Sequence, residues 1–148
     1  MSDIFFTSDT HFGHANTFLK FQNPDGSPMR PFTSVEEMDE TMIARWNGIV
    51  TPQDKIYHLG DVAFGPNDHF AKILRRLAGR KRLILGNHDK RTPKEYAEFF
   101  DDVYSSRLLD HILFTHILVD FYLQVFVREP YCVQAAGWNI QALANFLG

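Results

Sequence analysis

Short polar clusters that contain Asp, His and Asn stand at four separated places in the chain, each just after a short β-branched or aromatic run. They are Asp9-Thr10-His11, Gly60-Asp61, Gly86-Asn87-His88-Asp89 and Thr115-His116. Carboxylate, imidazole and amide groups are typical ligands of hard to borderline divalent metals. Because the ends of successive strands meet at one edge of a sheet, we expect the clusters to converge there. The pattern predicts a metal-assisted hydrolase.

The clusters contain enough ligands for two metal ions, which need a carboxylate between them and separate ligands on either side. Asp61 suits the bridging position, since Gly60 before it lets the backbone approach a crowded site closely. The other ligands would be Asp9 and His11 for one ion and Asn87 and His116 for the other. A water shared by both ions would become acidic enough to act as the nucleophile. Mixed imidazole and carboxylate ligands favour Mn²⁺, Fe or Zn²⁺ over Ca²⁺.

Strands are expected directly before three of the clusters. Apolar runs predict strands over residues 4–7, 55–59 and 82–85. The interval between Asp61 and Asn87 suits one strand–helix–strand crossover. A right-handed crossover places both residues at the same edge of a parallel sheet.

Three helices are expected between and after these strands. Ser34 begins the first, and Glu37 completes a capping box with it. Apolar spacing predicts the second over residues 67–78, with Gly79 as its C-terminal stop. Thr92-Pro93 opens the third, with proline in its first turn.

The character of the chain changes after Val103. Residues 111–116, 118–127 and 131–135 are predicted as β segments of a second sheet. Proline and glycine residues predict a surface loop over 22–32. No repeat or linker interrupts the chain, so we expect a single domain over residues 1–148.

Composition predicts a cytoplasmic protein without a membrane partner. The 148 residues carry a formal charge of −3, which favours neither a nucleic-acid tail nor a membrane anchor. Cys132 is the only cysteine, so an intrachain disulfide is excluded and a reducing compartment is expected. The N-terminal residues lack the features of a signal peptide. Polar residues interrupt the apolar stretch 112–127, which is therefore expected to form strands and not a membrane span.

Basic residues are concentrated around one predicted turn. They are Arg75, Arg76, Arg80, Lys81 and Arg82. Such a cluster can steer a polyanionic substrate, nucleic acid included. We favour the structural interpretation, which is favourable charge at a helix C-terminus and a solvated turn.

With these motifs the chain resembles the calcineurin-like metallophosphoesterase family. The family motifs are Asp-x-His, Gly-Asp, Gly-Asn-His-Asp/Glu, a lone His and Gly-His-x-His. The first four match Asp9/His11, Gly60-Asp61, Gly86-Asn87-His88-Asp89 and His116, and the resemblance covers about residues 3–116. It implies an α/β fold, a two-sheet β-sandwich flanked by helices. It also implies hydrolysis of phosphoesters, phosphodiesters more than monoesters, by a metal-activated water.

The resemblance also implies roles around the phosphate. His88 would contact the phosphate and assist the leaving oxygen, oriented by Asp89. The expected substrate-binding residues are His14, Asn87, His88, Lys90 and Arg91. His14 has an open alternative as a surface histidine, and His58, on a buried strand, is expected to be structural. Helical His-Asp phosphohydrolases also carry a His-Asp pair, but here the pair follows a strand end.

The fifth family motif is absent, since no histidine follows His116. Each ion would then keep three protein ligands and bind more weakly, with His111 a distant substitute. The region from about residue 117 is therefore atypical, as if a segment between about Asp120 and Val125 had been lost. Such a loss would expose strand edges near Phe121–Phe126, which permits a homo-oligomer. Two functions remain open. One is an active metal-dependent phosphoesterase, and the other is a catalytically impaired member that binds phosphate-containing ligands or a protein partner without turnover.

Overall fold

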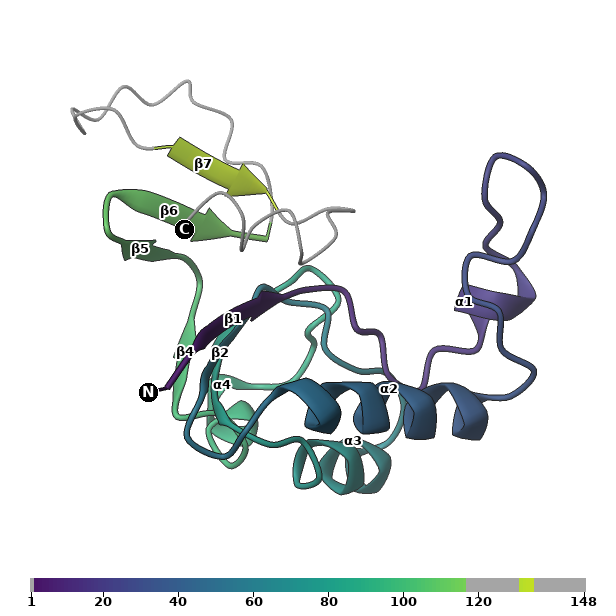
Figure 1. Ribbon diagram of the computed structural model, residues 1–148, viewed down its shortest axis with the longest axis horizontal. Helices are drawn as coiled ribbons and strands as arrows, with labels where there is room; N and C mark the ends of the chain where they lie inside the picture. Colours follow the sequence, from purple (N-terminus) through teal and green to yellow (C-terminus); the bar gives the residue numbers. More distant parts are fainter. Residues whose placement is uncertain (1, 117–130, 135–148) are drawn as a thin grey trace. The chain divides into compact units, whose positions relative to one another are not determined.

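The computed structural model describes residues 2–116 and 131–134 (Figure 1). Contacts within the chain divide it into two compact units. The sheet unit comprises residues 2–10, 53–62, 79–116 and 131–134 of the described chain, and the helical unit comprises 11–52 and 63–78. A single domain over 1–148 stays a prediction.

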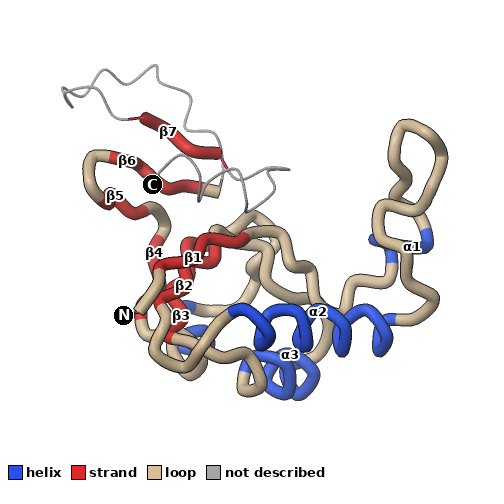
Figure 2. Tube along the Cα trace, in the orientation of Figure 1, coloured by secondary structure: helices blue, strands red, loops and turns tan. Residues whose placement is uncertain are grey.

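The first sheet of the sheet unit contains four parallel strands in the order β1-β2-β3-β4. Figure 2 colours its strands red. They are β1 (Ile4–Thr7), β2 (Lys55–His58), β3 (Arg80–Ile84) and β4 (Asp102–Tyr104). The three predicted strands are confirmed, although β3 begins two residues earlier than expected, and β4 was not predicted. Because β1, β2 and β3 run parallel and in register, their carboxyl ends lead into three of the polar clusters.

The second sheet contains β5 (Arg107–Leu109), β6 (Ile112–Thr115) and β7 (Tyr131–Gln134). The predicted segments 111–116 and 131–135 correspond to β6 and β7, whereas segment 118–127 lies outside the described residues. Strands β5 and β6 form an antiparallel hairpin, and β7 pairs with β6 in parallel.

The hairpin loop consists of Asp110 and His111, with φ of 46° and 70°. A two-residue hairpin turn of type I′ needs positive φ at both central residues. His111 is therefore a residue of this hairpin turn.

The two sheets pack against each other through an apolar core. Phe6, Tyr57, Leu59 and Ile84 contribute from the first sheet and its loops, and Phe114 contributes from β6. The rings of Phe6 and Phe114 stack with centroids 4.7 Å apart. The α/β class and the pair of packed sheets are confirmed.

The helical unit contains α1 (Asn16–Leu19), α2 (Val35–Ile49) and α3 (Asn67–Leu74). Ser34 caps α2 by accepting a hydrogen bond from the Glu37 N–H at 3.0 Å. The Glu37 carboxylate also accepts from the N–H and the hydroxyl of Thr33. The predicted start of this helix at Ser34 is thus confirmed.

Helix α3 ends at Leu74, four residues before the predicted end. Side chains of α2 form hydrogen bonds with backbone groups of residues 76 and 78, which would otherwise have formed the next turn of α3. Asn47 donates to the carbonyl of Arg76 and accepts from the N–H of Ala78, while the Trp46 indole donates to the Ala78 carbonyl. Gly79, with φ of +90°, therefore follows a turn and not the helix end.

Helix α4 (Pro93–Tyr96) begins as predicted. Thr92 and Glu95 form both halves of a capping box, and Pro93 occupies the first turn. Among the residues that the structure describes, no helix is long and apolar enough to cross a membrane.

The basic cluster makes ordinary structural contacts. Within the helical unit, Arg76 forms a two-pronged ion pair with Glu40. Within the sheet unit, Arg82 pairs with Asp102 at 3.1 Å. These contacts favour the structural interpretation of the cluster over substrate steering.

Candidate metal centre

Three predicted metal ligands have a left-handed backbone conformation that residues other than glycine rarely adopt. Asp9, His11 and Asp61 have φ of 52°, 48° and 57°. The left-handed conformation costs an L-residue about 1–2 kcal/mol, and such strain is concentrated at functional sites. Here it turns residues that follow strands β1 and β2 out of the extended direction.

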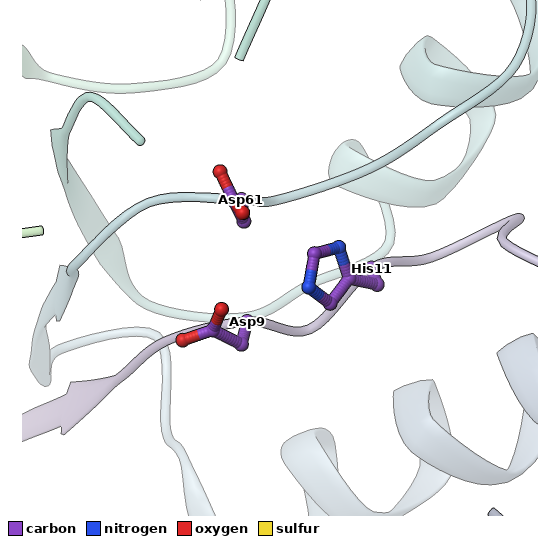
Figure 3. Close-up of side chains that lie close together, drawn as sticks. All are labelled: Asp9, His11 and Asp61. Carbon is purple, nitrogen blue, oxygen red and sulfur yellow. The ribbon is translucent and has the colours of Figure 1, made fainter. Parts of the chain in front are cut away.

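The same three side chains lie close together (Figure 3). Each offers one ligand atom, and these atoms all lie within 4.8 Å of one another. The backbone N–H of Asp9 donates to the carbonyl of Gly60 at 3.0 Å, which ties the two loops of the sheet unit together. Asp61 is 3% exposed, so its carboxylate is withdrawn from water. A carboxylate–imidazole–carboxylate group of this kind could hold a divalent cation.

Asp61 also belongs to a second group of polar atoms, which lies wholly within the sheet unit. The Nε2 atom of His116 lies 2.9 Å from Oδ1 of Asn87 and 3.5 Å from Oδ2 of Asp61. The Nδ1 atom of the same ring lies 2.6 Å from the carbonyl oxygen of Leu59. A carbonyl oxygen can only accept, so Nδ1 carries the proton of a neutral His116.

That proton fixes what the other ring nitrogen can do. With the proton on Nδ1, Nε2 of a neutral His116 presents a lone pair to the oxygens of Asn87 and Asp61. These three atoms all carry lone pairs that repel one another, and a cation between them would remove that repulsion. In addition, a metal-bound histidine commonly donates its other ring N–H to a backbone carbonyl, as His116 does here. The residues present therefore fit a metal ion, and Asp61 is common to both groups.

Two glycines allow the loops to approach each other. An added Cβ at Gly60 would lie 2.5 Å from the Gly86 backbone nitrogen and 2.8 Å from Nδ1 of His116. An added Cβ at Gly86 would collide with Asp61. The close approach predicted at Gly60 is therefore present, and it brings Asp61, Asn87 and His116 together.

Replacing Gly60 with alanine should destabilise the protein more than the same change at Gly26. Both glycines have positive φ, +95° and +82°, but a Cβ at Gly26 meets nothing within 4 Å. Gly26→Ala should cost only backbone strain, about 1–2 kcal/mol. Gly60→Ala adds overpacking worth about 1–3 kcal/mol. Denaturant unfolding of both variants measures the difference, and equal losses would contradict the close packing at Gly60.

Asp89 joins the two loops through backbone contacts. Its Oδ2 accepts from the N–H groups of Asp61 and Gly86, at 2.9 and 2.8 Å. Its Oδ1 accepts from the N–H of Val62 at 3.1 Å and from the Tyr96 hydroxyl at 3.2 Å. Burial, followed by the Asp89 charge, raises the pKa of Tyr96, which keeps its proton for this bond. Asp89 thus holds the loop that carries His88 and acts on the site as a positioning residue.

The structure places the predicted phosphate contacts on two loops. His88 is exposed, and its backbone N–H donates to Oδ1 of Asp61 at 2.9 Å. Lys90 is exposed in the same loop, where its ammonium donates to the carbonyl of Asn87, and Arg91 is half-buried. His14, in the helical unit, stacks on Phe64 with ring centroids 4.1 Å apart.

His58 has the structural role that its buried strand predicted. It is 1% exposed, and its Nδ1 accepts from the N–H of Gly60 at 3.2 Å. Its Nε2 then carries the proton and donates to the Thr10 hydroxyl at 2.8 Å, which donates in turn to the carbonyl of Val62. The network braces the loops that follow β1 and β2.

Sequence analysis did not identify Asp39, His69 or Tyr96 as supporting residues. Asp39 is only 4% exposed although it is acidic, because it faces inward from α2. The available signal was an acidic residue four positions after Val35, on the apolar face of the predicted helix. No comparable signal marked His69 or Tyr96.

The chain is similar to proteins from an archaeon and from phages. It is 42% identical over 92 residues to the uncharacterized protein MJ1445 of Methanocaldococcus jannaschii, covering 61% of this chain and 48% of that protein. It is 37% identical over 92 residues to the Gene 66 protein of Mycobacterium phage L5, covering 60% of this chain and 41% of that protein. The chain thus spans less than half the length of these relatives.

A solved structure has a similar fold. The protein of unknown function AQ665 from Aquifex aeolicus matches with a TM-score of 0.59 and 30% sequence identity, covering 77% of this chain and 60% of that one. The family model described as calcineurin-like phosphoesterase matches residues 2–145. This match shows that the chain belongs to the calcineurin-like phosphoesterase family.

Proposed function

We propose that this protein hydrolyses phosphoesters, preferentially phosphodiesters, with the help of two divalent metal ions. The observation that carries the proposal is the convergence of His116 Nε2, Asn87 Oδ1 and Asp61 Oδ2, with Nδ1 of His116 committed to a carbonyl. Family membership supports the phosphoester class of substrate. Mn²⁺, Fe and Zn²⁺ suit the imidazole and carboxylate ligands.

The proposed ligands divide into two sets that share Asp61. Asp9 and His11 would complete the first, and Asn87 and His116 the second. Metal ions held there would acidify a water molecule and neutralise charge on the phosphoryl group. The protein supplies the shape of the site, since strained backbones, the close-packed glycines and Asp89 fix the ligand-bearing loops before substrate arrives.

The residues beside this centre would handle the substrate. His88 is exposed, so a bound ester can reach its imidazole, which would contact phosphate and protonate the leaving oxygen. Lys90 adds positive charge in the same loop. His14 stays a proposed substrate contact of the helical unit. Asp89 contributes by holding the His88 loop.

Metal analysis combined with a diester assay tests this function. In the presence of excess Mn²⁺ the protein should bind about two metal ions per chain and hydrolyse bis(p-nitrophenyl) phosphate. Protein that binds phosphate-containing ligands but does not hydrolyse the diester would favour the catalytically impaired alternative.

His116→Ala should lower the metal content from about two ions per chain to about one. The variant removes the only imidazole of the second ligand set and should reduce hydrolysis in parallel. His111→Ala is the matched control, because His111 lies at the other end of the same strand, exposed in a hairpin turn. An unchanged metal content in His116→Ala would contradict the second ligand set, and a loss in His111→Ala would make that histidine a ligand.

A further inference from the structure

A buried acidic residue of α2 reaches the loop that carries His11. Asp39 is 4% exposed, and its Oδ1 accepts from the backbone N–H of Gly13 at 2.9 Å. Its Oδ2 lies 2.9 Å from Nε2 of His69, a residue of α3. All of these residues belong to the helical unit.

His69 contacts the same glycine from a second direction. A Cβ at Gly13 would lie 2.9 Å from Nε2 of His69 and 2.7 Å from the carbonyl oxygen of Phe64. Gly13 has φ of +78°, and it lies two residues after His11 and one before His14. The Asp39–His69 pair therefore holds the backbone at the centre of this loop.

Stability alone is a poor explanation for the pair. Asp is rarely fully buried unless it is paired, and burying a carboxylate costs free energy that its contacts must offset. Burial raises the pKa of Asp39 despite the opposing effects of Gly13 and His69. Because this folded-state pKa lies above that of the unfolded chain, ionised Asp39 reduces the stability of the fold at neutral pH.

The strained backbone of the 11–14 loop must be held in place by its surroundings, and the Asp39–His69 pair contributes to this. His11 is held in a left-handed conformation, and such strain persists only where the surroundings determine the backbone. The neighbouring anchor is the Phe64 N–H, which donates to the Phe12 carbonyl at 2.7 Å. Gly13 N–H bonded to Asp39 is the next anchor along the loop.

We propose that Asp39 and His69 form a clamp that positions the 11–14 loop for metal binding by His11 and substrate contact by His14. This inference rests on the proposed function for its purpose. Asp39 is a positioning residue in this scheme, since it acts through the backbone of Gly13. His69 fixes the direction of the Asp39 carboxylate.

The test compares Asp39→Ala and Asp39→Asn with Glu40→Gln, all in the 148-residue chain. Mn²⁺ affinity is measured by calorimetry, and protection of the Gly13 amide is measured by hydrogen exchange in metal-free protein. Asp39→Ala should weaken Mn²⁺ binding by about 10–100-fold, the usual effect of losing a residue that supports a ligand, and should expose the Gly13 amide. Glu40→Gln, at a neighbouring exposed acid, should change neither.

Asp39→Asn separates positioning from stability. Asparagine keeps an oxygen for the Gly13 N–H but loses the charge that burial disfavours. The metal-free variant should therefore be at least as stable as the wild type, keep Gly13 protected and lose less Mn²⁺ affinity than Asp39→Ala. A purely structural Asp39 would instead show stability and affinity falling together.

His69→Ala decides the question if Asp39→Ala does not fold, since the His69 side chain is 32% exposed and its removal opens no sealed cavity. It should weaken Mn²⁺ binding while the fold survives. Wild-type Mn²⁺ affinity in a folded Asp39→Ala or His69→Ala variant overturns the clamp alone. A wild-type protein that binds no Mn²⁺ contradicts the proposed function itself.

Discussion

Replacing Asp61 with asparagine should lower metal-dependent hydrolysis by about 10³-fold or more while the protein stays folded. Asp61 is the residue shared by both proposed ligand sets, so the change weakens both at once. The change also removes the negative charge of Asp61, which would attract the two cations. The result is measured as turnover of bis(p-nitrophenyl) phosphate and as Mn²⁺ content by elemental analysis.

The fold should survive this change for a specific reason. Oδ1 of Asp61 accepts the N–H of His88 at 2.9 Å, and asparagine of nearly equal volume keeps an oxygen for that bond. Glu36→Gln is the control, because Glu36 is an exposed acid in the first turn of α2. Near-normal turnover in Asp61→Asn would mean that the metal centre has been assigned to the wrong residues.

The parallel sheet and the candidate ligands could be predicted because both depend on local patterns. Apolar runs end at polar clusters, and parallel strands carry those clusters to one edge, as β1 and β2 show. The glycine at position 60 also has a local signal, since it precedes an acidic residue at a strand end. Its contact with Gly86, by contrast, depends on tertiary packing.

Features that depend on partners distant in the sequence could not be predicted. The end of α3 is set by Asn47 and Trp46 on another helix, although its own apolar spacing continues to residue 78. Asp39 interrupts an apolar face, but only the fold reveals that Gly13 and His69 are its partners.

His88→Ala should lower kcat by about 10²–10⁴-fold, the range for loss of a general acid, and leave the metal content unchanged. The side chain is exposed, whereas the link to Asp61 runs through the backbone N–H, which alanine keeps. The variant therefore removes the imidazole of His88 and leaves the proposed metal ligands in place. Elemental analysis and steady-state kinetics measure the two effects separately.

The choice of ester reveals what His88 does. A p-nitrophenyl ester has a leaving group that departs without protonation, so its hydrolysis should suffer less from His88→Ala than that of an alkyl ester. His111→Ala is the control for a lost exposed histidine and should leave both substrates unaffected. Equal losses on the two esters would contradict the role of His88 as a general acid. They would indicate that His88 only contacts the phosphate, because loss of such a contact affects both esters equally. A fall in metal content would instead make His88 a metal ligand, and the division between ligands and acid in this loop would be wrong.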